Sequence, residues 1–271
     1  MMVAKQMEIK IPAHRTEKTP MVLVLPADST SCKVTAGAGS CAIVLIRNVN
    51  RDFSFRFDLK KNAVLTCILE QTRPGTASYR HTCRLAAGSE MRSISVFTQC
   101  TNIRNLYKID LQEADSSFAM NSIAVLTGRE KLAQDILCRH VSGGARSMQT
   151  FKHLLGGAAQ ADMVGRILVP AGSQKTEAFQ QSRSILLSKE ASVHVEPQLE
   201  IYADDVKCSH GSTVGQLDKD ALFYMQQRGI GNEDAARMLL EAELRHELDS
   251  LPPTLRRILG AKVSRKLKHM V

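Results

Sequence analysis

Cys208 and His210 are the side chains in this sequence whose types and spacing best suit metal chemistry. They lie in the polar segment YADDVKCSHG, residues 202–211. Alternate residues of a β-strand share a face, with α-carbons roughly 7 Å apart, so a thiolate and an imidazole would stand side by side. This soft donor pair suits zinc or iron. Two ligands do not complete a site, so a second chain would have to supply the rest; a packed cysteine and a hydrogen-bonded histidine are the alternative.

Sequence motifs for other kinds of chemistry are missing. The chain contains no GxxxxGK[ST] phosphate-binding loop, no GxSxG nucleophile elbow and no HExxH zinc motif. Asp204 and Asp205 resemble the carboxylate pair of a glycosidase, but neighbouring residues of a regular strand point to opposite faces. Aromatic residues are only 4% of the chain and tryptophan is absent, which leaves few surfaces for stacking sugars or bases. A carbohydrate enzyme is therefore disfavoured.

Short strand-like runs occupy the chain from Met21 to about Gly211, with no helix of normal length among them. The clearest is residues 53–59, FSFRFDL, in which apolar and polar residues alternate without a break. So many short strands predict a sandwich, a barrel or a solenoid. One spacing favours the solenoid, because cysteines one coil apart would stack as a ladder. Three small residues in separate core positions would explain the same cysteines, which are Cys67, Cys83 and Cys100, 16 and 17 residues apart.

After Gly211 the apolar period becomes helical. Asp218 is expected to cap a first helix, which Gly229 ends, and Asn232 is expected to cap a second. A Pro-Pro pair breaks the second helix, and a third helical pattern runs from Thr254 to the end. The sequence therefore predicts a β-rich core followed by a small helical region.

The basic residues are concentrated at the end of the chain. The formal net charge is +9, and six lysines and arginines, with no acidic residue, lie from residue 254 onward. A solvated, partner-facing end is the simplest interpretation. Nucleic-acid binding is the alternative from a different functional class, and it would depend on Arg256, Arg257, Arg265, Lys266 and Lys268.

The cysteine content indicates the compartment. Seven cysteines, an odd number with no CxxC pair, favour reduced thiols rather than a disulfide framework. The first residues contain no apolar core of a secretory signal, and no apolar run is long enough to span a bilayer. We therefore expect a cytoplasmic protein.

Two long segments resemble the SufB/SufD family of iron–sulfur cluster assembly proteins: residues 173–188, SQKTEAFQQSRSILLS, and residues 197–230, PQLEIYADDVKCSHGSTVGQLDKDALFYMQQRGI. A looser similarity precedes them, MQTFKHLLGGAAQADMVGRILV. The resemblance covers about half the chain. The KCSHG and TVGQLD segments resemble the SufD branch rather than SufB.

The resemblance implies a fold that is mainly β: a right-handed parallel β-helix core with a small C-terminal α-helical subdomain. Together with the residue patterns it places an N-terminal tail at residues 1–20, the β-helix at residues 21–211 and the helical subdomain at residues 212–271. Most SufD chains carry a long helical N-terminal region, whereas this chain is expected to enter its first strand near Met21.

The resemblance also implies a non-enzymatic scaffold subunit of the SUF complex. It would pair with SufB through the β-helix and with the ATPase SufC through the C-terminal helices, which fits the missing phosphate loop. No cofactor is expected to bind stably, and a transient iron or iron–sulfur cluster would form at the interface with SufB. A self-associating homodimer scaffold is the related alternative.

Individual residues can be matched to this family. His210 matches the SufD histidine that faces a SufB cysteine, and Cys208 matches the neighbouring SufD cysteine. His140 and His153 lie at strand-like positions and are expected to be structural. The residues that match the helical region meeting SufC are Leu222, Phe223, Arg228, Gly229, Ile230, Ala236, Arg237 and Leu240.

Overall fold

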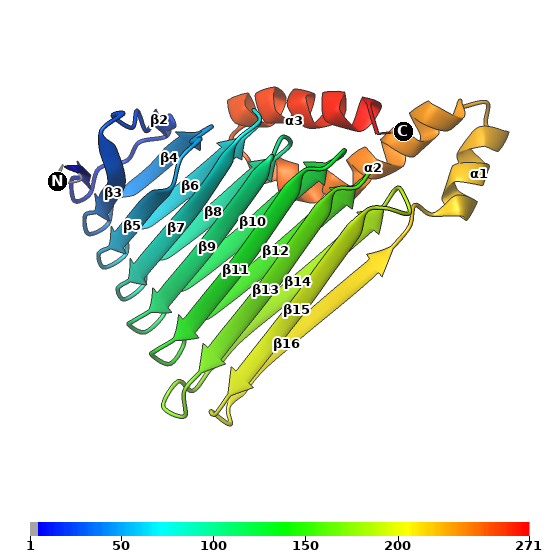
Figure 1. The fold of residues 1–271 in the computed structure, drawn as a ribbon. Helices are drawn as coiled ribbons and strands as arrows, with labels where there is room; N and C mark the ends of the chain where they lie inside the picture. The colour runs from blue at the N-terminus through cyan, green and yellow to red at the C-terminus, as the bar shows by residue number, and fades with distance from the viewer. Residues whose placement is uncertain (1–4, 271) are drawn as a thin grey trace.

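The computed structural model describes residues 5–270 as sixteen strands followed by three helices (Figure 1). Odd-numbered and even-numbered strands form two separate eight-stranded sheets, here called sheet A and sheet B. Sheet A contains β1 (Lys5–Ile11), β3 (Ser29–Ala36), β5 (Phe53–Leu59), β7 (Thr76–Leu85), β9 (Asn102–Leu111), β11 (Lys131–His140), β13 (Gln160–Val169) and β15 (Ser192–Ile201). Sheet B contains β2 (Met21–Val22), β4 (Cys41–Arg47), β6 (Val64–Gln71), β8 (Glu90–Phe97), β10 (Ser117–Leu126), β12 (Arg146–Leu155), β14 (Thr176–Leu186) and β16 (Val206–Gly215).

All of the strand pairings are parallel, so the chain winds as a solenoid with one strand of each sheet in every coil. Arg47 and Glu70, which are register partners early in the chain, are 23 residues apart. His153 and Ser184, which are partners near the other end, are 31 residues apart. The strands lengthen with the coils, from seven residues in β5 to ten in β12 (Figure 1). The predicted mainly β solenoid is confirmed.

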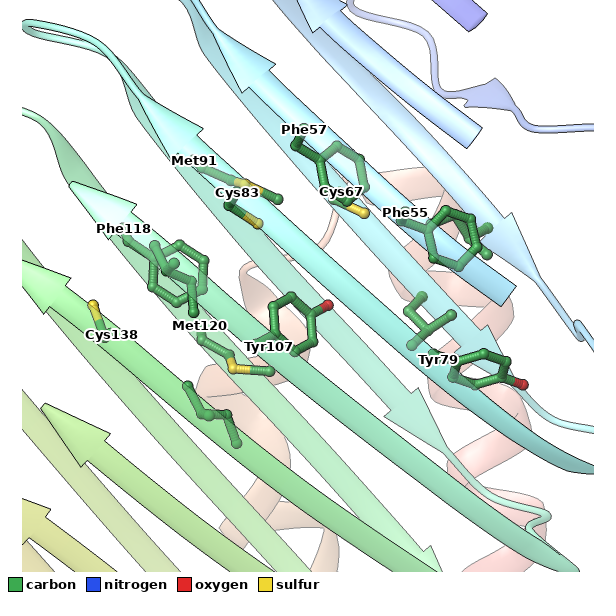
Figure 2. Close-up of a cluster of buried hydrophobic side chains, with 14 of the residues drawn as sticks. Phe55, Phe57, Cys67, Tyr79, Cys83, Met91, Tyr107, Phe118, Met120 and Cys138 are labelled. Carbon is green, nitrogen blue, oxygen red and sulfur yellow. The ribbon is translucent and has the colours of Figure 1, made fainter. Parts of the chain in front are cut away.

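Inward side chains from both sheets fill the space between them with one continuous core. Phe53, Phe55 and Phe57 alternate with polar residues along β5 and are at most 1% exposed, as the sequence pattern predicts. Tyr107 and Phe118 lie in the same core (Figure 2). Each buried side chain of this size contributes about 1.5–3 kcal/mol to folding, so the core is the main source of stability.

The buried cysteines do not form a ladder. Cys67 lies on β6 and Cys83 on β7, so the two face the core from different sheets (Figure 2). None of the register partners of either residue is a cysteine. A spacing of 16 or 17 residues is shorter than any complete coil, so the ladder interpretation is wrong. The thiols are small core residues instead.

The predicted boundaries of the solenoid need two corrections. β1 lies inside the expected tail of residues 1–20 and pairs with β3 along its length. Met7 and Ile9 pack against the core and Ile11 is buried in it, because they alternate with polar residues in a pattern that the sequence analysis missed. Residues 1–4 of the expected tail lie outside the described residues. At the other boundary, β16 continues past residue 211 to Gly215.

The helices are α1 (Lys219–Gln227), α2 (Asn232–Asp249) and α3 (Pro253–Lys268). Asp218 caps α1 as predicted, accepting hydrogen bonds from two backbone N–H groups, and Gly229 follows the helix with a φ of +83°. Asn232 is the first residue of α2 rather than its cap, and its side chain accepts a hydrogen bond from Gln226 instead. Within residues 5–270, no helix is long and apolar enough to cross a membrane.

α2 and α3 cover part of the outer face of sheet B, where a second hydrophobic core forms (Figure 1). The basic end of the chain is therefore a packed helix, and the expected solvated end describes only its outer face, where Arg257, Arg265 and Lys268 are exposed. The residues of α2, of α3 and of the connection between them that are buried in this second core are Leu240, Leu244, Leu251, Leu255, Leu259, Val263 and Leu267. They meet Leu45, Ile68, Ile94, Val96, Ile123, Val125, Leu154 and Ile185 of the sheet.

A buried carboxylate ties α3 to the early coils. Glu70, at the end of β6, is 0% exposed and pairs with Lys262 of α3. It also accepts hydrogen bonds from Arg47 Nε at 2.8 Å and Thr72 Oγ1 at 2.8 Å. Burial opposes the ionisation of Glu70, but the hydrogen bonds from Lys262, Thr72 and Arg47 outweigh it and hold its pKa below the usual value. Glu70 therefore stays ionised and needs these partners.

Replacing Lys262 by methionine should destabilise the protein, because Glu70 would remain buried with fewer partners. We expect the free energy of unfolding in urea to fall by about 1–2 kcal/mol at neutral pH, since a hydrogen bond to a charged group contributes about 1.5–3 kcal/mol and Lys262 is partly solvated. Lys268→Met is the matched control, because Lys268 lies on the same helix, is exposed, and forms no ion pair within the described residues.

The effect of Lys262→Met should depend on pH. Because the pKa of Glu70 is lowered in the folded protein, the stabilisation is fully present above the ordinary glutamate pKa of about 4.3 and is lost as the pH falls through the lowered folded-state pKa. The stability difference between the variant and the parent protein should therefore shrink in acid. A difference of the same size at neutral and acidic pH would contradict the role of Glu70.

Candidate functional site at the open end of the solenoid

β15 and β16 are the last strands of their sheets, and together they form an open end of the solenoid (Figure 1). Within the described residues, β15 pairs only with β13, and β16 pairs only with β14. Each strand therefore presents one edge of backbone N–H and C=O groups that no neighbouring strand satisfies. Two such unpaired edges, one on each sheet, can accept strands from another chain.

Cys208 and His210 lie side by side on β16 at this open end. They are in register with Ala178 and Gln180 of β14, whose side chains are buried inside the solenoid. The predicted shared face of Cys208 and His210 is therefore confirmed. Cys208 is half-buried and His210 is exposed, because no further coil covers β16. The two donors thus sit at inward positions that are open to solvent.

The thiol of Cys208 is not activated by its surroundings. Partial burial raises its pKa above the usual value, and the backbone N–H of Ala178 only partly offsets this effect. The sulfur therefore carries its proton at neutral pH and becomes a thiolate only when a cation or metal replaces that proton. This arrangement suits a ligand that binds on demand, and it does not suit a nucleophile.

The donor pair is incomplete within this chain. Among residues 5–270 there is no group of three or more His, Cys, Asp or Glu side chains that could hold a metal ion. Asp204 and Asp205 lie in the turn between β15 and β16, where the Asp205 backbone N–H donates to Gln174 Oε1 at 2.9 Å. These acidic residues organise the turn. Cys208 and His210 would need donors from another chain to complete a metal site.

Apolar side chains extend the exposed surface around the donor pair. Val214 of β16 is 50% exposed, and Tyr202, in the turn before β16, is 64% exposed. Ile201 at the end of β15 is also exposed. The exposure of these residues could not be predicted from the sequence, because an alternating apolar pattern looks the same in a covered coil and in an uncovered one. An exposed apolar surface of this kind indicates a site for a protein partner.

α1 forms a second exposed surface. Within α1 no residue is buried, and Phe223 and Tyr224 are 62% and 59% exposed. The Arg228 guanidinium lies 5.1 Å from the centre of the Tyr224 ring. Figure 1 shows α1 standing beyond the solenoid, next to the end that carries β16. These observations favour Phe223 and Arg228 as candidates for contact with a partner.

Two of the residues matched to a partner-binding region face inward instead. Leu240 is 0% exposed and packs against sheet B, and Ala236 is 6% exposed. They cannot contact a partner without rearrangement of α2, because the helix must bury its apolar stripe on the solenoid. Leu222 and Ile230 are half-buried, Gly229 is exposed, and Arg237 forms an ion pair with Asp234 at 2.7 Å.

The interior histidines are buried and neutral. Burial lowers the pKa of His81 to about 3 and that of both His140 and His153 to about 4. His140 Nε2 lies 2.9 Å from Ser147 Oγ, and His153 Nδ1 lies 3.1 Å from Ser184 Oγ. These contacts support the structural role expected for His140 and His153.

Three of the six basic residues of α3 form ion pairs within the chain. Lys262 pairs with Glu70, Lys266 Nζ lies 2.8 Å from Glu130, and Arg256 pairs with Asp249. The nucleic-acid hypothesis needed a free basic surface from residue 254 onward. Within the described residues Arg257, Arg265 and Lys268 form no ion pair, so ion pairing reduces the free basic surface and does not remove it.

Comparison with known proteins gives one matching family model, described as SUF system FeS cluster assembly, SufBD core domain, over residues 29–243. A SufBD family protein of iron–sulfur cluster assembly from Synechocystis sp. is 33% identical over 72% of this chain and 43% of its own length.

Proteins described as SufD are also similar. The iron–sulfur cluster assembly protein SufD of Escherichia coli is 36% identical over 52% of this chain and 33% of its own length. SufD of Bacillus subtilis is 28% identical over 62% of this chain and 37% of its own length. This chain therefore matches less than half the length of each of these relatives.

The cysteines should differ sharply in reactivity. In the native protein at neutral pH, a maleimide should label Cys208 and Cys41, which are half-buried. The other five should react only after denaturation, because burial removes access and raises the thiol pKa, to about 11 for Cys32 and about 12 for Cys67. Mass spectrometry of digested protein identifies the labelled sites, and rapid labelling of Cys67 in the folded chain would show that the core is not closed.

Proposed function

This chain belongs to the SufBD core family of the SUF iron–sulfur cluster assembly system, and we propose that it is a non-enzymatic, SufD-like scaffold subunit. The observation that carries this proposal is the open solenoid end, where an incomplete donor pair lies between two unpaired strand edges. A scaffold needs a surface on which a second chain completes a site. It does not need a catalytic group of its own.

The proposed partner at the open end is SufB. A SufB solenoid with its own uncovered coil would add strands to the edges of β15 and β16 and continue both sheets across the interface. The apolar residues Ile201, Tyr202 and Val214 would be buried in the same step. Backbone hydrogen bonds would then provide much of the affinity, and the exposed side chains would provide the specificity.

The proposed cargo at this interface is iron or a nascent iron–sulfur cluster, held transiently. Cys208 and His210 would supply a sulfur and a nitrogen donor, and the partner would supply the remaining ligands. An incomplete donor set favours transient binding, because the site exists only while both chains are together. The half-buried, protonated Cys208 thiol would lose its proton on binding the metal.

The proposed second partner is the ATPase SufC, which would bind through α1. α1 offers Phe223, Tyr224 and Arg228 on an exposed surface, and its own cap and the glycine after it set its direction. Aromatic residues and arginine are the side chains that most often dominate binding energy at interfaces. For ATP to act on the open end, SufC must contact α1 differently in its two nucleotide states.

Val214→Asp should disrupt pairing with SufB, because it would place an unpaired charge inside the proposed interface. We expect the affinity, measured by light scattering and titration of the mixed proteins, to fall by about 100-fold. Val141→Asp is the matched control, because Val141 is also 50% exposed but lies in the turn after β11.

Two results would contradict the SufB proposal. If Val214→Asp binds SufB like the parent chain, the open end is not the interface. If the parent chain alone has twice its monomer mass and Val214→Asp is monomeric, the same surface makes a homodimer scaffold instead.

Phe223→Ala should weaken binding of SufC without affecting SufB. Loss of an aromatic anchor at an interface costs about 2 kcal/mol or more, so we expect about 30-fold weaker binding of SufC in a titration. Tyr202→Ala is the control, because Tyr202 has a similar exposure but lies at the open end. Unchanged SufC binding by Phe223→Ala would remove α1 as the contact surface.

A further inference from the structure

Two buried amide side chains lie directly beneath His210 inside the solenoid. Gln149 of β12, Gln180 of β14 and His210 of β16 are successive register partners, so their side chains occupy consecutive rungs of sheet B. Gln149 is 0% exposed and Gln180 is 3% exposed. Gln180 Nε2 donates a hydrogen bond to Gln149 Oε1 at 3.0 Å. The two amides form a short ladder that ends beneath His210.

A glycine on the opposite sheet leaves room for the Gln180 amide. A Cβ atom added to Gly165 of β13 would lie 2.1 Å from Gln180 Nε2 and 2.7 Å from Gln180 Oε1. Real Cβ atoms never approach another heavy atom so closely, so any other residue at position 165 would displace the amide. Gly165 and the hydrogen bond to Gln149 together fix the position of Gln180.

The ladder has a direction, which its unpaired atoms reveal. The rung below Gln149 is Met120, which offers no strong acceptor, and Gln149 Nε2 has no partner. At the other end, Gln180 Oε1 is buried and also has no partner. A buried acceptor without a donor costs about 1–3 kcal/mol. Because the nitrogen of Gln180 is used towards β12, its oxygen remains available for the next rung, which is His210.

His210 has the donor that Gln180 lacks. A neutral imidazole carries one N–H group and one free lone pair. Within the described residues β16 is the last strand of sheet B, so no further strand covers the His210 ring. In proteins, a histidine that ligates a metal usually donates its second ring N–H to a carbonyl or carboxylate, which fixes its tautomer and orientation.

We propose that Gln180 is a positioning residue for His210: its amide oxygen accepts the N–H of one ring nitrogen and leaves the lone pair of the other nitrogen facing the open end. Gln149 and Gly165 act through Gln180 by holding its amide in place. The hydrogen bond itself depends only on the fold. That the free nitrogen binds iron or a cluster rests on the proposed function.

The tautomer of His210 tests this proposal directly. We would label the histidines with ¹⁵N and record long-range proton–nitrogen spectra of the full chain at about pH 8.5, above the ordinary histidine pKa of about 6.5. The His210→Ala spectrum identifies the His210 signals. In the parent protein, one ring nitrogen should be protonated and the other should not. In Gln180→Leu, the ¹⁵N chemical shifts of both ring nitrogens should be averaged between the two tautomers.

Gly165→Ala provides an independent arm, since it displaces the amide while keeping Gln180 itself. It should give the same averaged signals as Gln180→Leu, whereas Gly172→Ala should not, because a Cβ atom there meets nothing within 4 Å. Thermal unfolding of each variant shows that the solenoid is intact. If His210 keeps a single tautomer in both Gln180→Leu and Gly165→Ala, the positioning role is wrong.

Cluster assembly by the complex with SufB and SufC separates this inference from the proposed function. Gln180→Leu should slow assembly about 10-fold, the usual lower bound for loss of such a supporting contact, and adding it to His210→Ala should cause no further loss. An additional loss in the double variant would overturn positioning through His210. A third outcome is that Gln180→Leu no longer holds His210 in a single tautomer, while His210→Ala assembles clusters normally. In that case Gln180 positions the ring, and the proposed function of His210 fails.

Discussion

No coil of this solenoid can satisfy its own backbone, because every strand is hydrogen-bonded to strands of the neighbouring coils in the same sheet. A strand needs a neighbouring coil on each side to pair all of its backbone groups, and only the coils between the two ends have both neighbours. At β15 and β16 this need is left unmet, on two sheets at once. The same stacking that creates the long buried core thus leaves unpaired strand edges at β15 and β16. The candidate site is therefore a consequence of the architecture and does not require a specialised loop.

The interior of the solenoid changes character along its length. The early coils are filled by large apolar and aromatic side chains, such as Phe55 and Phe57. In the later, longer coils, glutamine, serine and neutral histidine occupy inward positions and hydrogen-bond to one another, as His153 does with Ser184 and Gln134. Buried polar groups are stabilising only when partnered, so they specify one register of stacking more strictly than apolar groups do. This polar section leads to the open end.

The helical region divides into two parts with different roles in the fold. α2 and α3 behave as part of the solenoid, because they bury leucines on sheet B and are tied to it by ion pairs from Lys262 and Lys266. α1 buries none of its residues. A partner that contacts α1 would therefore act on an element joined to the packed helices by a short connection containing Gly229. The fold separates a rigid cover from a surface that is free for contact.

The sequence by itself determined the local structure and the identity of the candidate donors. The alternation in residues 53–59 predicts β5 with its observed bounds, because a half-buried strand exposes every second residue to a different environment. Asp218 and Gly229 likewise mark the ends of α1, since capping depends on neighbouring residues alone. Cys208 and His210 could be placed on one face for the same reason.

Only the tertiary structure could decide which residues of neighbouring coils come into contact. The cysteine spacing suggested a ladder that the true coil length excludes, and the basic end of the chain became a packed helix once Glu70 and Glu130 were brought beside it. The burial of Leu240 and the exposure of Val214 follow from which faces are covered, and identical apolar patterns occur in both situations. The relation of Gln180 to Gly165 and His210 joins strands of both sheets, and the stacking of the coils sets their relative positions. Register between coils is a property of the whole stack, so no single segment encodes it.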